Sequence, residues 1–267
     1  MHLKALEVAF AVSCVGSGAA ELQQSVLAAW DRCLADVDDE PAPAHRLTLL
    51  LDDDPQEIAT RAGDADLFGS DLATLMDRLS PLVTRLAVTD RRDDLTMFHA
   101  CAAAEPATGA TAVLFGPSGT GKTTLARALC GELVYLSDET AGVSRDLDVV
   151  PYPKPLSVIE RPGDELKAQL SPSRLGLRPH GSDPYSLRVL VQLRRDPDHR
   201  GEVLLENLPT IEALPDLVAQ TSFTRAMDRP LARLAAIADR VGGVRRVTYA
   251  ESADLLPVVR DLLREAG

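Results

Sequence analysis

The chain has 267 residues and a formal net charge of −12, with 45% hydrophobic and 4% aromatic residues. This length suits one large domain or two smaller ones with a substantial core. The acidic balance argues against nonspecific binding to nucleic acid or to an acidic membrane, because both need a basic face. Apolar runs are too short to cross a bilayer, and a secretory signal is not recognisable. We therefore expect a cytoplasmic protein whose scattered cysteines stay reduced.

The first 92 residues are predicted to form a small N-terminal α/β unit for recognition of a substrate or partner. In chain order, the periodicities predict a strand over 4–14, a helix over 20–37, a strand over 45–54 and a helix over 70–88. The last helix has Ser70 or Asp71 as its N-cap. The three aspartates at 52–54 are interpreted as a polar turn after a strand. The residues leave open whether this unit selects substrate, forms dimer contacts or covers a sheet.

Residues 93–267 are predicted to form a second domain in which strands alternate with helices. Two apolar runs, 95–105 and 109–115, are joined by "PATG" and predict a hairpin. The remaining expected elements are a helix ending near 131, strands over 133–137, 186–195 and 244–250, and helices over 210–223, 230–241 and 252–266. Prolines within 149–163 preclude a central strand or helix interior there. This alternation predicts an α/β fold with its ligand at the strand ends.

A glycine-rich loop, "GPSGTGKTT", lies between the apolar run 111–115 and a predicted helix. Its pattern is G-x4-G-K-[ST], in a context that favours a phosphate-binding loop. The predicted nucleotide-binding residues are Gly116, Ser118, Gly119, Thr120, Gly121, Lys122, Thr123 and Thr124. Glycines let the amide groups converge on phosphate oxygens, and the helix N-terminus adds donors and a positive dipole end. Lys122 is expected to reach the β- and γ-phosphates, and the Thr123 hydroxyl to bind magnesium.

Many P-loop enzymes hold magnesium with an aspartate at the end of a separate apolar strand. The strand 186–195 ends in two arginines instead, and Glu206 lies in a short run. The strand after the loop helix, however, ends in the acidic pair Asp138 and Glu139. A strand–helix–strand unit is right-handed and parallel, so this pair is expected at the same sheet edge as the glycine loop. A carboxylate there suits phosphoryl transfer, which needs a base for an acceptor hydroxyl and a metal.

With these residues in place, "FHA…LFGPSGTGKTTLARAL…YLSDET" resembles the HPr serine kinase/phosphorylase family. It is more similar still to the broader group of HPr-kinase-related P-loop kinases, some of which accompany peptide-modification pathways. The resemblance covers about 95–265 and implies a P-loop core of the HPr-kinase/PEP-carboxykinase type that uses ATP and Mg²⁺. It implies that Asp138 is the catalytic base, that Glu139 and Thr123 hold the metal, and that His99 supports or neutralises the acid. Lys122 completes the implied catalytic set.

The chain departs from HPr kinases in carrying Asp-Glu where that family has Asp-Asp, and Lys-Thr-Thr at the end of the loop. It also lacks a recognisable copy of the later glycine-containing signature used in phosphorolysis. We therefore expect a kinase acting on a hydroxyl, as in serine of a peptide or protein or in a small metabolite, and not on HPr. Two alternatives stay open: a PEP-carboxykinase-like or ATP-hydrolysing enzyme, and a non-catalytic nucleotide-sensing module that binds peptides. Homo-oligomer formation is likewise left open.

Two further groups of basic residues qualify as accessory sites. Lys154, in "PYPKPLS", either directs its charge toward substrate or is a solvated loop lysine. Arg174, Arg178 and His180 lie in a loop rich in turn residues, which suits a lid over a nucleotide.

Overall fold

The computed structural model describes residues 1–35, 42–159, 166–182 and 184–266. The chain folds into two compact units, and the first of them is discontinuous. Unit 1 comprises Met1–Arg91 and Lys154–Leu175, whereas unit 2 comprises Arg92–Pro153 and Gly176–Gly267. Within the described residues, no helix combines the length and the apolar character needed to cross a membrane.

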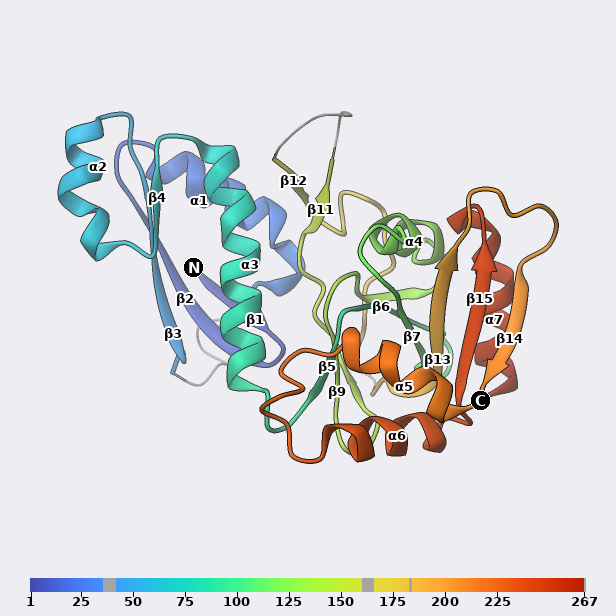
Figure 1. Cartoon of the computed structure of the whole chain (residues 1–267). Coiled ribbons are helices and arrows are strands. Elements are labelled where there is room, and N and C mark those ends of the chain that lie inside the picture. Colours follow the sequence, from blue (N-terminus) through green and yellow to red (C-terminus); the bar gives the residue numbers. More distant parts are fainter. Residues whose placement is uncertain (36–41, 160–165, 183, 267) are drawn as a thin grey trace. The chain divides into compact units, whose positions relative to one another are not determined.

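Unit 1 is built on a four-stranded sheet of order β1-β2-β3-β4, in which β2, β3 and β4 are parallel and β1 is antiparallel (Figure 1). Helices α1 and α3 contact each other and the sheet. Its elements from the first segment are β1 His2–Ala5, β2 Val8–Val15, α1 Ala19–Ala29, η1 Asp31–Cys33, β3 His45–Leu51, α2 Pro55–Arg61, η2 Ala62–Asp64, β4 Leu67–Gly69 and α3 Leu72–Asp90. Apolar side chains of these elements, such as Phe10, Leu22 and Leu79, are completely buried between helices and sheet.

The beginning of unit 1 differs from the predicted single strand over 4–14. Leu6 and Glu7 take positive φ angles of 50° and 66°, so the chain reverses and β1 pairs with β2 as a hairpin. Neither residue is a glycine, asparagine or aspartate, which are the usual signals for such a turn. Helix α1 is also shorter than predicted, because a 3-10 turn, η1, follows it. Residues 36 and 37, the end of that predicted helix, lie outside the described residues.

The aspartates after β3 form the expected polar turn. Asp52 accepts hydrogen bonds from the backbone N–H groups of Ser17 (2.9 Å) and Asp54 (3.0 Å). Asp54 accepts from the backbone N–H of Gln56 (2.8 Å) and caps α2. These carboxylates therefore satisfy backbone donors at a strand end and a helix start.

Helix α3 begins where the sequence predicts. Its N-cap is Asp71, whose carboxylate accepts from the backbone N–H (2.7 Å) and the hydroxyl (2.6 Å) of Thr74. The Thr74 hydroxyl and then its backbone N–H lower the pKa of Asp71, because both bonds favour the ionised carboxylate.

Replacing Asp71 with alanine is expected to lower the free energy of unfolding by about 1 kcal/mol, the usual value of an N-cap. Because the pKa of Asp71 is lower in the folded state, its contribution is present above the ordinary aspartate pKa. It is lost as the pH falls through the lowered value. Urea unfolding of D71A at neutral and acidic pH measures both effects. Asp64→Ala, an exposed aspartate in η2, is the control, and equal losses in the two variants would contradict the cap.

The segment Lys154–Leu175 belongs to unit 1, although it follows the glycine loop and the sequence placed it in the second domain. It forms the two-stranded antiparallel sheet β11 Leu156–Val158 with β12 Ala168–Leu170. Three side-chain hydrogen bonds fix it to the first segment: Gln169 Nε2 donates to Asp77 Oδ1 (3.2 Å), Ser171 Oγ donates to Asp31 Oδ1 (2.7 Å), and Ser173 Oγ accepts from Arg32 Nε (2.9 Å). Such long-range contacts leave no local signal in the sequence. Residues 160–163 of the predicted proline-rich crossing lie outside the described residues.

Unit 2 contains a six-stranded sheet of order β14-β15-β13-β7-β6-β8. Strands β7, β13 and β15 are parallel, whereas β6 runs antiparallel to both β7 and β8. A second, three-stranded sheet has the order β10-β9-β5. The elements are β5 Thr96–Phe98, β6 Ala100–Ala104, β7 Ala110–Phe115, α4 Lys122–Leu129, β8 Val134–Ser137, β9 Ala141–Val143, β10 Val149–Val150, β13 Ser186–Arg195, β14 Leu204–Leu208, α5 Thr210–Ala219, α6 Pro230–Arg240, β15 Val244–Tyr249, η3 Ser252–Asp254 and α7 Leu255–Glu265.

Helices cover both faces of the six-stranded sheet (Figure 1). Helices α4 and α7 contact each other and the central strands β6, β7 and β13. Helices α5 and α6 contribute Ala213, Leu217, Leu234 and other side chains to a core with Val113 and Phe115 of β7. The predicted α/β fold class is thereby confirmed, with parallel strands at the centre of the sheet.

Candidate functional site

The glycine loop follows the buried central strand β7 and leads into α4, as predicted. A Cβ at Gly116 would lie 3.1 Å from the Leu193 Cβ on β13, so the chain passes close to that strand. Gly119 and Gly121 have φ angles of +88° and +81°, a region that other residues rarely adopt. Gly121 is the N-cap of α4. The backbone thus turns in the manner that directs amide groups and a helix N-terminus toward an anion.

Lys122 folds back over the start of the loop. Its Nζ donates to the carbonyl oxygens of Gly116 (2.8 Å) and Pro117 (3.3 Å), and the residue is 8% exposed. Burial lowers the pKa of Lys122, and the neighbouring Glu139 carboxylate opposes that shift. A lysine held in this position places a positive charge at the mouth of the loop, where phosphate oxygens would lie.

Asp138 lies beside the loop, and both of its carboxylate oxygens accept hydrogen bonds from hydroxyl groups. Thr123 Oγ1 donates to Oδ2 (2.9 Å), and Tyr135 Oη donates to Oδ1 (3.0 Å). Asp138 is 3% exposed and Tyr135 is fully buried. The Thr123 hydroxyl donates its hydrogen bond to Asp138, so the lone pairs of its oxygen remain available to a cation.

The sheet order explains how these residues meet. Strand β6 lies between β7 and β8 and is antiparallel to both, so β7 and β8 run in the same direction. They therefore end at the same edge of the sheet, about 10 Å apart, the spacing of two strands with one between them. The loop after β7 and the acidic pair after β8 meet across the end of β6.

Glu139 and His99 complete the group. Ser137 Oγ accepts from the backbone N–H of Thr140 (3.1 Å), which shapes the turn carrying the acidic pair. The carbonyl of Glu139 accepts from the backbone N–H of Ala100 (3.1 Å), so the turn is joined to β6 next to His99. Burial and then the positive charge of Lys122 lower the pKa of His99, although Glu139 raises it. These influences together favour the neutral form of His99.

Two tyrosines that the sequence patterns did not single out support the site. Tyr135 holds Asp138, and Tyr249, at the end of β15, donates its hydroxyl to the carbonyl of Thr120 in the loop (2.8 Å). Burial raises the pKa of Tyr249 to about 12, so its hydroxyl remains a donor. A tyrosine in a buried strand needs a partner for its hydroxyl. That rule flags Tyr135, but it does not say which residue is the partner.

Replacing Tyr135 with phenylalanine is expected to cost about 1–3 kcal/mol of the free energy of unfolding. The reason is that a buried oxygen of Asp138 then loses its donor. Burial and the nearby Asp138 carboxylate raise the pKa of Tyr135 well above its usual value, so the hydroxyl stays protonated as donor. Urea unfolding measures the loss, and stability equal to that of the wild type would contradict the structural role of this bond.

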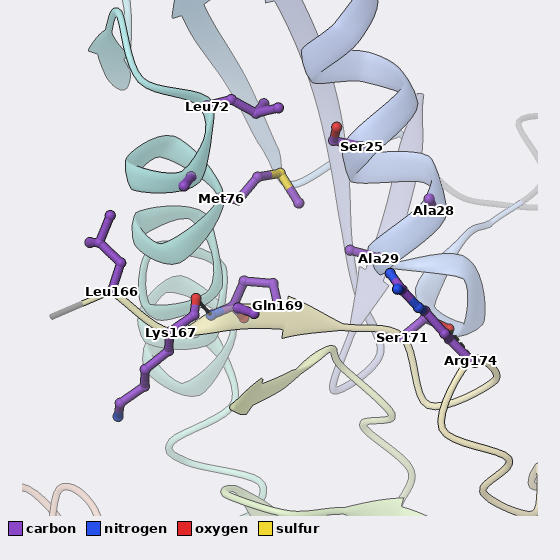
Figure 2. Close-up of a pocket in the computed structure, with 12 residues that line it drawn as sticks. Ser25, Ala28, Ala29, Leu72, Met76, Leu166, Lys167, Gln169, Ser171 and Arg174 are labelled. Atoms are coloured by element: carbon purple, nitrogen blue, oxygen red, sulfur yellow. Dashed lines mark hydrogen bonds between the residues drawn. The ribbon is translucent and has the colours of Figure 1, made fainter. Parts of the chain in front are cut away.

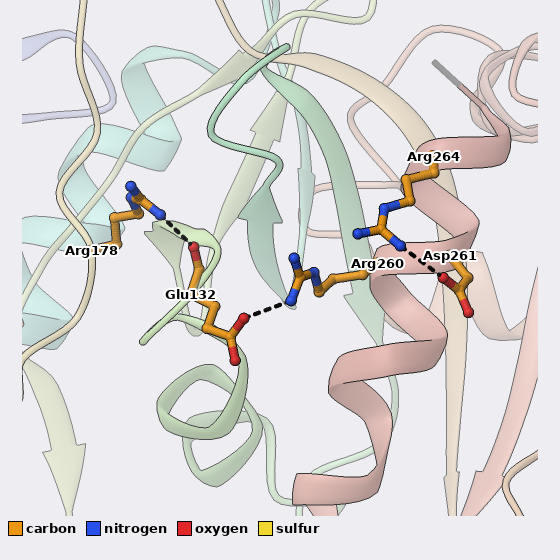
Figure 3. Close-up of polar contacts among 5 residues, drawn as sticks. All are labelled: Glu132, Arg178, Arg260, Asp261 and Arg264. Atoms are coloured by element: carbon orange, nitrogen blue, oxygen red, sulfur yellow. Dashed lines mark hydrogen bonds and ion pairs between the residues drawn. The ribbon is translucent and has the colours of Figure 1, made fainter.

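A polar network anchors the turn between α4 and β8 (Figure 3). The carbonyl of Glu132 accepts from Arg178 Nη1 (3.0 Å), and its carboxylate pairs with Arg260 Nη1 of α7 (2.6 Å). The backbone of Arg178 also bonds to Cys130 and Tyr135. Arg178 therefore belongs to the framework that holds α4 and β8, and does not act as a residue of a lid.

The other accessory residues lie elsewhere. Lys154 is fully buried in unit 1, where its Nζ donates to the carbonyl of Pro155 (3.2 Å), so it is not a solvated loop lysine. Arg174 is an exposed residue of unit 1, and His180 is a half-buried residue of unit 2. Of the predicted nucleotide-binding residues, Ser118, Gly119 and Thr124 are exposed on the loop and on the first turn of α4.

Comparisons with known proteins support the interpretation of the loop. The family described as "ATPase family associated with various cellular activities (AAA)" matches residues 112–147, which span the loop, α4 and the acidic pair. Comparison with curated proteins gives no match. Among solved structures, the HPr(Ser) kinase/phosphatase from Coxiella burnetii is similar at 11% sequence identity and a TM-score of 0.31. That similarity covers 63% of this chain and 94% of the other. Unit 2 contains a P-loop nucleotide-binding core.

Proposed function

We propose that this protein is an ATP- and Mg²⁺-dependent phosphotransferase that moves the γ-phosphate to a hydroxyl group. The acceptor would be a serine of a peptide or protein, or a small metabolite. The observation that carries the proposal is the contact between the loop and the acidic pair, Thr123 Oγ1 to Asp138 Oδ2 at 2.9 Å. Such a contact places an anionic group and a hydroxyl oxygen beside the loop, where phosphoryl transfer needs them.

The donor set fits a magnesium–nucleotide. Thr123 and Asp138 offer hard oxygen atoms, which Mg²⁺ prefers, and this ion is usually held by one or two carboxylates together with substrate phosphates. Lys122 and the loop amides suit the phosphates. When bound, the metal and the triphosphate would supply the transferable group and neutralise the charge that develops on it.

The family resemblance makes Asp138 the base and Glu139 a metal ligand, but the contacts favour the opposite division. Asp138 is almost fully buried, and its two oxygens already accept hydrogen bonds from the hydroxyl groups of Thr123 and Tyr135. A carboxylate so occupied is suited to anchoring a metal site and poorly suited to receiving a proton from an acceptor. Glu139 is less buried and follows directly on the same turn. We therefore assign Asp138 to the metal and Glu139 to the acceptor hydroxyl.

The remaining residues would act on position and charge. Lys122 stabilises negative charge at the mouth of the loop, while its bonds to the Gly116 and Pro117 carbonyls hold it there before a ligand arrives. His99 would support the turn through the backbone of Glu139. Tyr249 holds the carbonyl of Thr120 and so fixes the shape of the loop.

Hydrolysis of ATP is the second candidate, and the AAA match over 112–147 favours it. In that case Glu139 would activate water in place of an alcohol. Incubation of the whole chain with γ-labelled ATP, Mg²⁺ and pools of serine-containing peptides and small alcohols separates the candidates. Stable label on an acceptor supports the phosphotransferase, free phosphate alone supports hydrolysis, and nucleotide binding without either product supports a sensor module.

A further inference from the structure

Unit 1 contains a pocket of about 720 Å³ between α1, α3 and β12 (Figure 2). This volume falls in the range of about 300–1,000 Å³ that is usual for ligand sites. Small side chains on the two helices make the room: Ala28 and Ala29 on α1, and Ala73 on α3. Met76 of α3 adds a larger apolar surface. The pocket is therefore an apolar space between two helices, closed at one end by a strand.

The strand at that end has a free edge. Within the described residues, β12 pairs with β11 alone, and successive residues from Leu166 to Gln169 line the pocket. Figure 2 shows β12 crossing one end of the pocket, with β11 on the side away from the labelled residues of α1 and α3. Alternate residues of an antiparallel strand direct their backbone N–H and C=O groups away from the partner strand. An edge of this kind is a template for another extended chain.

The edge strand is fixed in place before any ligand binds. The Gln169 amide donates to Asp77 of α3, and the Ser171 hydroxyl donates to Asp31 of η1, so the middle of β12 and the residue that follows it are tied to the first segment. A template whose geometry is set in advance loses less entropy when a chain is added to it.

The rim of the pocket carries positive charge. Lys167 and Arg174 are both exposed and both line the pocket, in a chain whose net charge is −12. Leu166 lies beside them with 40% of its surface exposed and adds apolar surface to the rim of the pocket. Charge and apolar surface therefore favour a ligand that carries acidic and apolar groups side by side.

We propose that unit 1 binds an extended peptide segment, which adds as a strand to the free edge of β12. An apolar side chain of that segment enters the pocket between Ala28, Ala73 and Met76, and acidic side chains pair with Lys167 and Arg174. Strand addition supplies main-chain hydrogen bonds, and the pocket supplies selectivity for side chains. The inference rests on the proposed function in one respect, because it takes the bound peptide or protein segment to be the acceptor of the phosphate.

The test starts from the whole chain and a display library of random dodecapeptides, and individual synthetic peptides are then measured by fluorescence anisotropy. Selected peptides are expected to alternate apolar with other residues and to be rich in acidic ones. Ala28→Trp, which fills the pocket from an exposed position of α1, should weaken binding about tenfold or more. The double charge reversal K167E/R174E should weaken it likewise and remove its dependence on salt. Arg85→Glu, an exposed charge reversal elsewhere on α3, is the matched control and should change little.

A second measurement tests strand addition itself. N-methylation of alternate amides in a selected peptide should abolish binding in one set of positions and leave it intact in the other, because only one set faces β12. Equal effects of the two sets would overturn the strand geometry. The site would be overturned if the wild type enriches no peptide beyond those that the Ala28→Trp variant also enriches. It would also be overturned if the selected peptides bind both pocket variants as tightly as the wild type.

Binding in unit 1 is separable from the chemistry in unit 2. Peptides should bind a Lys122→Ala chain as tightly as the wild type, because Lys122 belongs to the P-loop. Peptides that bind but accept no phosphate would support the docking site and count against the phosphotransferase. Transfer to a small alcohol by a chain that binds no peptide would overturn the docking site and leave the proposed chemistry standing.

Discussion

Replacing Glu139 with glutamine is expected to lower the turnover number for phosphoryl transfer by about 10²–10⁴-fold, the usual contribution of a general base. The Mg²⁺ concentration at half-maximal rate should hardly change. Replacing Asp138 with asparagine should instead raise that Mg²⁺ concentration by about 10–100-fold, because the group that orients Thr123 loses its charge. Initial rates over a range of Mg²⁺, with nucleotide binding measured separately, distinguish the two roles.

Glu105→Gln serves as the control for this pair, since Glu105 is also half-buried but lies at the opposite end of β6. It should behave as the wild type. The opposite pattern, in which D138N loses turnover at saturating Mg²⁺ while E139Q keeps it, would return the base to Asp138, as the family resemblance implies.

Replacing Lys122 with alanine is expected to weaken nucleotide binding by about 10–10²-fold. This corresponds to the loss of charge-assisted hydrogen bonds of about 1.5–3 kcal/mol. Turnover should fall further, because the same ammonium group would stabilise charge in the transition state. Isothermal titration with ATP and with a non-hydrolysable analogue measures the first effect, and labelled phosphate release or transfer measures the second.

Arg127→Ala is the matched control, because Arg127 is an exposed cation on the same helix. Its removal should leave nucleotide affinity unchanged. Wild-type affinity in K122A would show that the glycine loop is not the nucleotide site, whatever the outcome for the acidic pair.

Local patterns in the sequence were sufficient for most elements of unit 2 and for the P-loop. Strand β13 has the predicted bounds, 186–195, because apolar residues recur along most of its length. Helix α3 starts after the predicted cap because Asp71 is followed by a clear helical period. The loop and the acidic pair were predicted to share a sheet edge, because the strand–helix–strand connection has a fixed hand.

Features that depend on distant contacts could not be predicted in the same way. The turn at Leu6 and Glu7 has no turn residues, and only the pairing of β1 with β2 in the folded unit reveals it. The hydrogen bonds to both oxygens of Asp138 come from α4 and β8, and the sequence pattern, which predicted Asp138 as the base, did not predict these bonds. The membership of Lys154–Leu175 in unit 1 depends on Gln169 and Ser171 reaching residues more than ninety positions away.

The discontinuity of unit 1 has a consequence for synthesis of the protein. During translation, a domain can close only after all of its segments have left the ribosome. Residues 154–175 emerge after the glycine loop, so the N-terminal unit stays incomplete, with part of its apolar surface uncovered, while residues 92–153 of the next unit are being made. A fragment ending near residue 91 would remain incomplete in the same way, with part of its apolar surface uncovered. The two units are therefore expected to mature in an interleaved order, with chaperone dependence greatest for nascent chains between these lengths.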